Sequence, residues 1–294
     1  MRTYIDCVPC FVRQAVDATR LVSGDEAIAE RVLRRVLAAI ARMRMDRPPP
    51  FMGREIHRII REETGSTDPY ARLKDQSTQL ALDLAERVEH LIAGAPDPFG
   101  AAVRFAIAGN VLDYALASTW DASKIEPVIE EALSKPVDAE ALRILQETAS
   151  TARDILYIGD NAGETVLDRI LIQRLPENTV TYAVKGAPVI NDATRKDAEN
   201  AGIGDVARIV ANGSDAPGTI LDLCSPEFVD RFENADVVIA KGQANLETLG
   251  DSTRDIFFLT QVKCPVVAHD LTVQVGDWLV EYRQPVSVAR RSPH

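Results

Sequence analysis

Asp160 and Asn161 follow a short apolar run, Ile155–Ile158, after a single glycine, in the segment Gly159-Asp160-Asn161-Ala162-Gly163-Glu164. Such a run predicts a buried strand, and the glycines permit a tight turn into a following helix. A carboxylate beside an amide oxygen is a donor pair that a hard cation such as Mg²⁺ or Mn²⁺ prefers. An ordinary helix cap uses the same residue types, so capping is the alternative interpretation.

A second apolar run, Val180–Val184, leads into the polar segment Lys185–Thr194, which contains Asp192. In an open parallel sheet the ligand binds beyond the carboxyl ends of the strands, so Asp192 is expected to lie near Asp160. We expect Asp192 to complete the metal site. The alternative is that it caps a helix beginning near Ala193.

Lysines close two of the predicted strands, Lys185 after Val180–Val184 and Lys241 after Val237–Ala240. An ammonium at the end of a buried strand loses hydration, which is costly unless it faces an anion. Lys241 is therefore the strongest candidate for contact with a phosphate, and Lys185 is the second. A surface lysine at a strand end is the alternative. Glu164, which ends the first polar segment, is a further candidate for contact with substrate.

Asn110 and Asp113 lie three residues apart in an otherwise mostly apolar helical stretch, 106–117. This spacing places both side chains on one face of a helix. We expect that face to form a wall of the substrate site, and a structural hydrogen-bonded pair is the alternative.

Other catalytic signatures are absent or isolated. Gly-Lys never occurs, so there is no phosphate-binding loop ending in Gly-Lys-Ser/Thr, and no nucleophile elbow accompanies the four histidines. Cys7-Val8-Pro9-Cys10 is a lone CxxC motif without the further ligands that a closed zinc site needs, and small buried residues at the start of a helix are the expected interpretation. A zinc knuckle and a redox pair stay open as alternatives, so the sequence does not decide the role of Cys7 and Cys10. His269 follows a predicted strand and is interpreted as structural.

The elements that position these residues change character along the chain. From Cys10 to Leu91 apolar residues recur at helical spacing, and Pro48-Pro49-Pro50 separates two helices. After residue 150 short β-rich runs alternate with helical lengths, which is typical of a parallel sheet covered on both faces. The expected strands are 155–158, 180–184, 206–210, 237–240 and 266–268.

This change predicts two parts. Residues 1–95 form a helical bundle domain, and residues 96–294 form a three-layer α/β/α domain with a mainly parallel, Rossmann-like sheet that binds metal and phosphate. The fold class is α/β.

Composition limits the function. The chain has 294 residues, of which 44 are acidic and 33 basic, and its net charge is −11. This charge disfavours nucleic acid as a partner, and no apolar stretch is long enough to span a membrane. No leader follows Met1 and the cysteines are few, so we expect a cytoplasmic protein with reduced thiols. Oligomeric state is not predicted.

The CxxC motif, Gly159–Glu164, Asn191–Thr194 and Lys241-Gly242-Gln243-Ala244-Asn245-Leu246-Glu247 occur in this order, and together they resemble the damage-control phosphatases. This ARMT-like family was formerly known as domain of unknown function eighty-nine, and the stand-alone prokaryotic branch is the most similar. The resemblance spans nearly the whole chain. It implies a helical domain beside an α/β/α domain and hydrolysis of small phosphomonoesters with Mn²⁺, Mg²⁺, Co²⁺ or Ni²⁺.

The resemblance also assigns residues. It implies Asp160, Asn161 and Asp192 as metal ligands, Lys241 and Asn245 in a phosphate pocket, and Asn110 and Asp113 nearby. Asp160, Asp192 and Lys241 are the expected catalytic residues.

The function expected from these observations is a metal-dependent phosphatase acting on sugar phosphates or related damaged metabolites. Neither the natural substrate nor the choice between a phosphoenzyme and direct attack by water follows from the sequence. Two alternatives stay open: an S-adenosylmethionine-dependent carboxyl methyltransferase and a non-catalytic sensor of phosphorylated metabolites.

Overall fold

The computed structural model describes residues 1–119, 125–177 and 179–284, with side chains in these ranges except those of 110–119 and Ile125. The helices are α1 (Cys7–Val22), α2 (Glu26–Ile40), α3 (Pro50–Thr64), α4 (Ala71–Ala93), α5 (Pro98–Thr119), α6 (Ile125–Ser134), α7 (Ala139–Thr151), α8 (Thr165–Ile172), α9 (Arg195–Asn200), α10 (Pro226–Asn234), α11 (Gln243–Leu249) and α12 (Pro265–Leu271). The strands are β1 (Ile155–Ile158), β2 (Val180–Val184), β3 (Arg208–Ala211), β4 (Val237–Lys241), β5 (Ile256–Gln261) and β6 (Trp278–Arg283). No helix among the described residues is long and apolar enough to cross a membrane.

A single six-stranded sheet forms the centre, with the order β3-β2-β1-β4-β5-β6. The first five strands in this order run parallel, and β6 pairs antiparallel with β5. In chain order, β2 and β3 are added on one side of β1, and β4 is then added on its other side. The order therefore reverses between β1 and β4, where open α/β sheets bind ligands.

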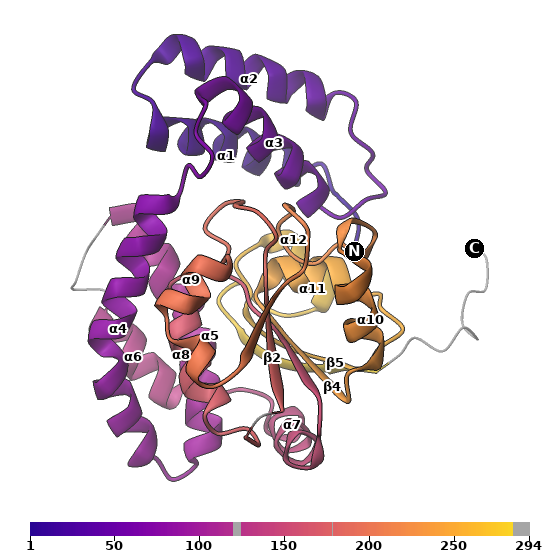
Figure 1. The fold of residues 1–294 in the computed structure, drawn as a ribbon. Coiled ribbons are helices and arrows are strands. Elements are labelled where there is room, and N and C mark those ends of the chain that lie inside the picture. The colour runs from indigo at the N-terminus through magenta and orange to yellow at the C-terminus, as the bar shows by residue number, and fades with distance from the viewer. Residues whose placement is uncertain (120–124, 178, 285–294) are drawn as a thin grey trace.

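Helices cover both faces of the sheet, which explains why its central strands are buried throughout and mostly apolar (Figure 1). Along β1, Tyr157 packs into one cluster together with α4 to α8, whereas Leu156 packs into the other with α10 to α12. This alternation is the two-residue period of a strand. The α/β/α architecture and the mainly parallel sheet expected from the sequence are confirmed.

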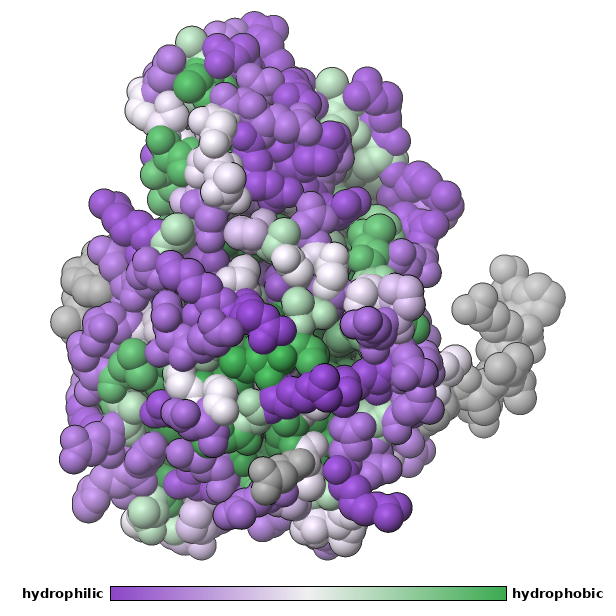
Figure 2. Space-filling view, in the orientation of Figure 1, coloured by the Kyte–Doolittle hydropathy of each residue, from purple (hydrophilic) through white to green (hydrophobic). Residues whose placement is uncertain are grey.

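The first three helices form a separate layer above the carboxyl ends of the strands (Figure 1). Their core contains Phe11 of α1, Val32 of α2 and Ile56 of α3. Asp25 caps α2, and Pro50 stands in the first turn of α3, where its missing N–H costs nothing. Hydrophilic side chains dominate the top of the molecule, where α2 and α3 lie (Figure 2). We call α1–α3 the helical cap.

The hydrophobic cluster of the helical cap contains residues of α1 to α3, whereas α4 contributes to the cluster on the sheet; the domain boundary after residue 95 stays a prediction. Ala81, Ala85, Val88 and Ile92 of α4 belong to the cluster that covers the sheet. Leu84 and Leu91 of the same helix are partly buried against this cluster. Helical periodicity alone does not tell which neighbour a stripe packs against.

Two expected strands differ from the structure. Residues 266–268 lie in α12, whose first residue is Pro265, so His269 is also helical. The strand of this region is instead β5, a buried run, followed by the antiparallel β6. A three-residue apolar run is too short to distinguish a strand from a helix, and a proline favours the first position of a helix. The strand expected at 206–210 is shifted to Arg208–Ala211.

Candidate functional site

The loops after β1 and β2 are joined to each other at the rim of the sheet. Asn161 and Asp192 form an antiparallel bridge, in which the N–H of Ala162 donates to the carbonyl of Asn191 at 2.9 Å and the N–H of Ala193 donates to the carbonyl of Asp160 at 2.7 Å. This pairing holds Asp160, Asn161 and Asp192 together beside the point where strand order reverses.

The end of β4 packs tightly against the same group. Gly242 has a φ of 77°, and a Cβ there would lie 1.8 Å from Oδ2 of Asp160. Only glycine permits both this backbone conformation and this close approach. Gly242 therefore allows α11 to begin directly beside Asp160.

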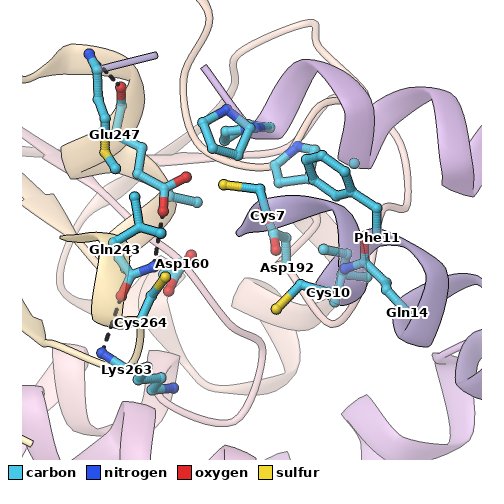
Figure 3. A pocket seen from close by; sticks show the side chains of 18 of the residues that line it. Cys7, Cys10, Phe11, Gln14, Asp160, Asp192, Gln243, Glu247, Lys263 and Cys264 are labelled. Carbon is cyan, nitrogen blue, oxygen red and sulfur yellow. Dashed lines mark hydrogen bonds between the residues drawn. The ribbon is translucent and has the colours of Figure 1, made fainter. Parts of the chain in front are cut away.

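A cavity of about 380 Å³ opens between these loops and the helical cap. Asp160, Asn161 and Asp192 line it from the sheet side. The cap contributes Cys7, Cys10, Phe11, Gln14, Pro49, Pro50 and Gly53, and the remaining wall includes Pro217, Gln243, Glu247, Lys263, Cys264 and Val266. Figure 3 shows Cys7 and Cys10 facing Gln243, Glu247 and Cys264 across the cavity. The volume falls within the range of about 300–1,000 Å³ typical of small-molecule sites.

Negative charge is concentrated at the sheet side of the cavity. Burial raises the pKa of Asp160 well above its ordinary value, and the charges of Glu164 and Asp192 raise it further. Burial also raises the pKa of Asp192, although Lys185 opposes this shift. Oδ2 of Asp192 is buried without a hydrogen bond, and Nζ of Lys185 lies 3.3 Å from it as an ion pair. A cation at this position would relieve the repulsion among the carboxylates.

Lys241 is fully buried behind the cavity. Its Nζ donates to the carbonyl of Ala106 at 2.9 Å, to Glu164 Oε2 at 2.9 Å and to Asp168 Oδ1 at 2.6 Å. Burial alone would lower the pKa of Lys241, but Asp168 and Glu164 outweigh it and raise the pKa. These three acceptors engage the ammonium, so in this structure Lys241 holds buried carboxylates in place.

Glu164 connects this ammonium to the cavity. Its Oε1 accepts from the backbone N–H of Asn161 at 2.8 Å and from the side-chain amide of Asn161 at 3.0 Å. Nδ2 of Asn161 donates to Glu164 and to Asp160, and these two hydrogen bonds fix the orientation of the Asn161 amide.

Two more predicted residues also lie behind the cavity wall. Nζ of Lys185 donates to the carbonyl of Gly218 and pairs with Asp192. Asn245 is fully buried and donates to the carbonyls of Gly159 and Lys241 at 3.2 and 2.7 Å.

The predicted set therefore separates into two groups. The first group lines the cavity and consists of Asp160, Asn161 and Asp192. The second group is buried next to these residues and does not line the cavity; it consists of Glu164, Lys185, Lys241 and Asn245. Contact of the second group with substrate stays a prediction. Asn110 and Asp113 are in α5, but their side chains lie outside the described residues.

The structure adds residues that sequence reasoning missed. Lys263 lines the cavity, and its positive charge lowers the pKa of Asp160. It was missed because the strand before it, β5, was not recognised. Glu247 lines the cavity as well, and burial raises its pKa to about 7. Glu247 follows Gln243 by four residues in α11, a spacing that places both on one helix face.

The residues present fit a hard divalent cation. The donor set is two carboxylates and an amide, all oxygen-bearing, with one buried carboxylate oxygen that has no hydrogen bond. No group of three or more His, Cys, Asp or Glu side chains in the described ranges is arranged to hold a metal by itself. Water and phosphate oxygens would therefore complete the coordination, as they commonly do for Mg²⁺.

The chain is similar to proteins of one family over most of its length. The family described as "Damage-control phosphatase ARMT1-like domain" matches residues 3–279. A damage-control phosphatase of Pyrococcus horikoshii is 32% identical over 281 residues, covering 94% of this chain and 96% of the relative. A damage-control phosphatase of Archaeoglobus fulgidus is 32% identical over 285 residues, covering 94% and 97%. An uncharacterized protein of Methanocaldococcus jannaschii is 34% identical, covering 92% of each chain.

A solved structure agrees with these relatives. The crystal structure of a DUF89 family protein from Pyrococcus horikoshii superposes with a TM-score of 0.87 at 31% identity, covering 97% of this chain and 100% of that chain.

Proposed function

The chain belongs to the family of the damage-control phosphatase ARMT1-like domain, and from this premise we propose that it is a divalent-metal-dependent phosphatase that hydrolyses phosphomonoesters of small metabolites. The natural metal in this proposal is Mn²⁺, Mg²⁺, Co²⁺ or Ni²⁺, and the substrates are sugar phosphates or related damaged metabolites.

One observation carries the proposal. Asp160, Asn161 and Asp192 meet at the wall of one cavity, although they come from two different loops. Two buried carboxylates beside each other are unfavourable without a cation, so their convergence supports a metal site.

Asp160, Asn161 and Asp192 would hold the metal through their side-chain oxygens. When bound, the metal supplies charge neutralisation and polarisation of the phosphoryl oxygens. Glu164 keeps the Asn161 amide in position through its hydrogen bond of 3.0 Å, and Lys185 balances the charge of Asp192.

Other residues of the cavity would bind the substrate. Lys263 lines the cavity as an exposed lysine, and it would attract the phosphate electrostatically. Phe11 and Pro217 give apolar surface to the remaining wall, which suits a small organic group attached to the phosphate. The cap and the sheet together enclose this group and limit its size.

Two other classes of function make different predictions. An S-adenosylmethionine-dependent methyltransferase would bind its cofactor without a divalent metal, and calorimetry with each ligand separates this class. A sensor would bind metal and a sugar phosphate but release no inorganic phosphate.

The decisive experiment is a phosphate-release screen over sugar phosphates, nucleotides and phosphopantetheine derivatives, repeated with each of the four metals and with a chelator. We expect release of phosphate from at least one small phosphomonoester, dependent on metal and abolished by the chelator. Binding without release in every condition would replace the enzyme with the sensor. Release that persists in the chelator would contradict the metal dependence.

A further inference from the structure

Three thiols face the cavity from two different parts of the molecule. Cys7 and Cys10 belong to α1 of the helical cap, and Cys264 precedes α12 at the rim of the sheet (Figure 3). All four cysteines are free thiols in the structure. The fourth, Cys224, is not among the residues that line the cavity, and its Sγ donates to the carbonyl of Ile220 at 3.3 Å.

The chain segments that carry Cys7 and Cys264 are in contact. Tyr4, three residues before Cys7, donates through Oη to Oδ1 of Asp270 in α12 at 2.9 Å. Val266, two residues after Cys264, packs against the core of the cap, and Cys7 is itself part of that core. These contacts hold the beginning of α1 against the Cys264 segment, beside the cavity that both cysteines line.

A bond between the two thiols of the CxxC motif would have to distort the first turn of α1. Cys7 begins α1 and Cys10 lies in its first turn, where backbone hydrogen bonds already link Cys7 to Tyr4 and Val8 to Ile5. In a helix, Cβ atoms three residues apart are about 5–6 Å apart, whereas a disulfide needs about 3.5–4.5 Å. Cys264 has extended backbone and is not bound by this helical spacing.

We propose that Cys7 and Cys264 are an oxidation site, at which a peroxide converts the two thiols into a disulfide between the helical cap and the sheet. Hydrogen peroxide first oxidises one thiol to a sulfenic acid, which releases one water. The second thiol then attacks this sulfur, the S–S bond forms, and the sulfenic oxygen leaves as a second water. The two sulfurs lose two electrons in total, the peroxide gains them, and the two thiol protons end in water.

The order of the two steps follows from exposure. Within this pair Cys264 is partly exposed and is oxidised first, whereas Cys7 is buried and resolves the sulfenic acid. Burial raises the pKa of Cys7, and the neighbouring Cys264 raises it further, so Cys7 is the less readily oxidised of the two; it loses its proton as it attacks the sulfenic sulfur.

The disulfide would change the cavity itself. Cys7 and Cys264 line the same space as Asp160 and Asp192, so a bond between the two sulfurs crosses part of that space. It would also fix the cap relative to the sheet. Oxidation is therefore expected to block access to the carboxylates. Only this last consequence rests on the proposed phosphatase function.

The test begins with the covalent product. Trypsin cuts after Arg2, Arg13, Lys263 and Arg283, which puts Cys7 and Cys10 in peptide 3–13 and Cys264 in peptide 264–283. After treatment with hydrogen peroxide, mass spectrometry of the full chain should detect these two peptides joined. The Cys10→Ser variant should give the same product, because Cys7 is then the only thiol left in peptide 3–13.

Three further readouts are expected. The count of free thiols in the denatured protein falls from four to two, the melting temperature rises, and phosphate release from an aryl phosphate is lost until dithiothreitol restores it. Cys264→Ser should abolish all three changes. The matched control is Cys224→Ser, which should form the joined peptides as the wild type does.

Two outcomes would overturn the proposal: a disulfide confined to peptide 3–13, or retention of free Cys7 and Cys264 after peroxide treatment. If the wild type releases no phosphate under any condition, the proposed function fails while the peptide measurement still tests the disulfide.

Discussion

Nζ of Lys241 lies 2.6 Å from Oδ1 of Asp168, and both side chains are fully buried. Asp168 also accepts hydrogen bonds from the hydroxyls of Tyr157 and Tyr182 at 2.7 and 2.8 Å. The lysine that closes β4 thus belongs to a charged network under the sheet rim. Through Glu164 this network reaches the amide of Asn161, which lines the cavity.

Lys241→Met should destabilise the protein, because it leaves Glu164 and Asp168 buried without their cation. Breaking a buried ion pair from one side typically costs about 3–5 kcal/mol in the free energy of unfolding. Urea unfolding measures this loss. The control is Lys196→Met, since Lys196 pairs with Asp75 on the surface at 3.4 Å and such a pair contributes only about 0–1 kcal/mol. Equal stability losses in both variants would refute the supporting role of Lys241.

Glu247→Gln should change how stability depends on pH. Burial raises the pKa of Glu247 from 4.5 to about 7, so the folded protein binds the proton more tightly than the unfolded chain does. The stability that this group contributes is present below pH 4.5 and is lost as pH rises toward and through 7. A shift of this size corresponds to about 3 kcal/mol.

Glutamine keeps the shape of Glu247 without its charge. In chelator, the free energy of unfolding should therefore fall less between pH 5 and pH 8 in Glu247→Gln than in the wild type. Glu140→Gln is the control, because Glu140 is exposed and pairs with Arg143 on the surface. If Glu247→Gln and the wild type lose the same stability over this interval, the carboxyl group does not titrate as expected.

Lys263→Met should weaken substrate binding more than turnover. Lys263 is exposed and lines the cavity, so its charge would attract the phosphate. A charge-assisted contact is worth about 1.5–3 kcal/mol, which corresponds to a rise in KM of about ten- to a hundredfold. Steady-state kinetics with an aryl phosphate measure it, with Lys196→Met again as the control. An unchanged KM would remove Lys263 from the site.

The sequence predicted the part of the site that follows from strand ends. Asp160 and Asp192 follow β1 and β2, and parallel strands bring their carboxyl ends to the same edge. The apolar runs that mark these strands are buried on both faces, which makes their positions readable from the residue types alone.

The other features of the site depend on contacts between residues distant in sequence, which no local sequence pattern predicts. Contact of Lys241 with a phosphate stays a prediction, and the sequence did not reveal its ion pairs with Glu164, which precedes α8, and with Asp168 in α8. Which side of the strand a terminal lysine takes is decided by partners distant in sequence. The helical cap reaches the cavity only through tertiary contacts. No sequence pattern therefore predicted that Cys7, Glu247 and Cys264 line the same cavity.

The central claim is that Asp160, Asn161 and Asp192 bind one divalent cation, and calorimetric titration with Mn²⁺ tests it most directly. We expect one binding site in the wild type, loss of that site in Asp160→Asn and in Asp192→Asn, and wild-type binding in the control Asp83→Asn, whose carboxylate lies on the exposed surface of α4. Asp160→Asn removes repulsion between buried carboxylates, so its fold should be retained. Asp192→Asn also removes the charged partner of the buried Lys185, so urea unfolding must show that this variant is folded before its titration is compared. Wild-type affinity for Mn²⁺ in both site variants would contradict the account.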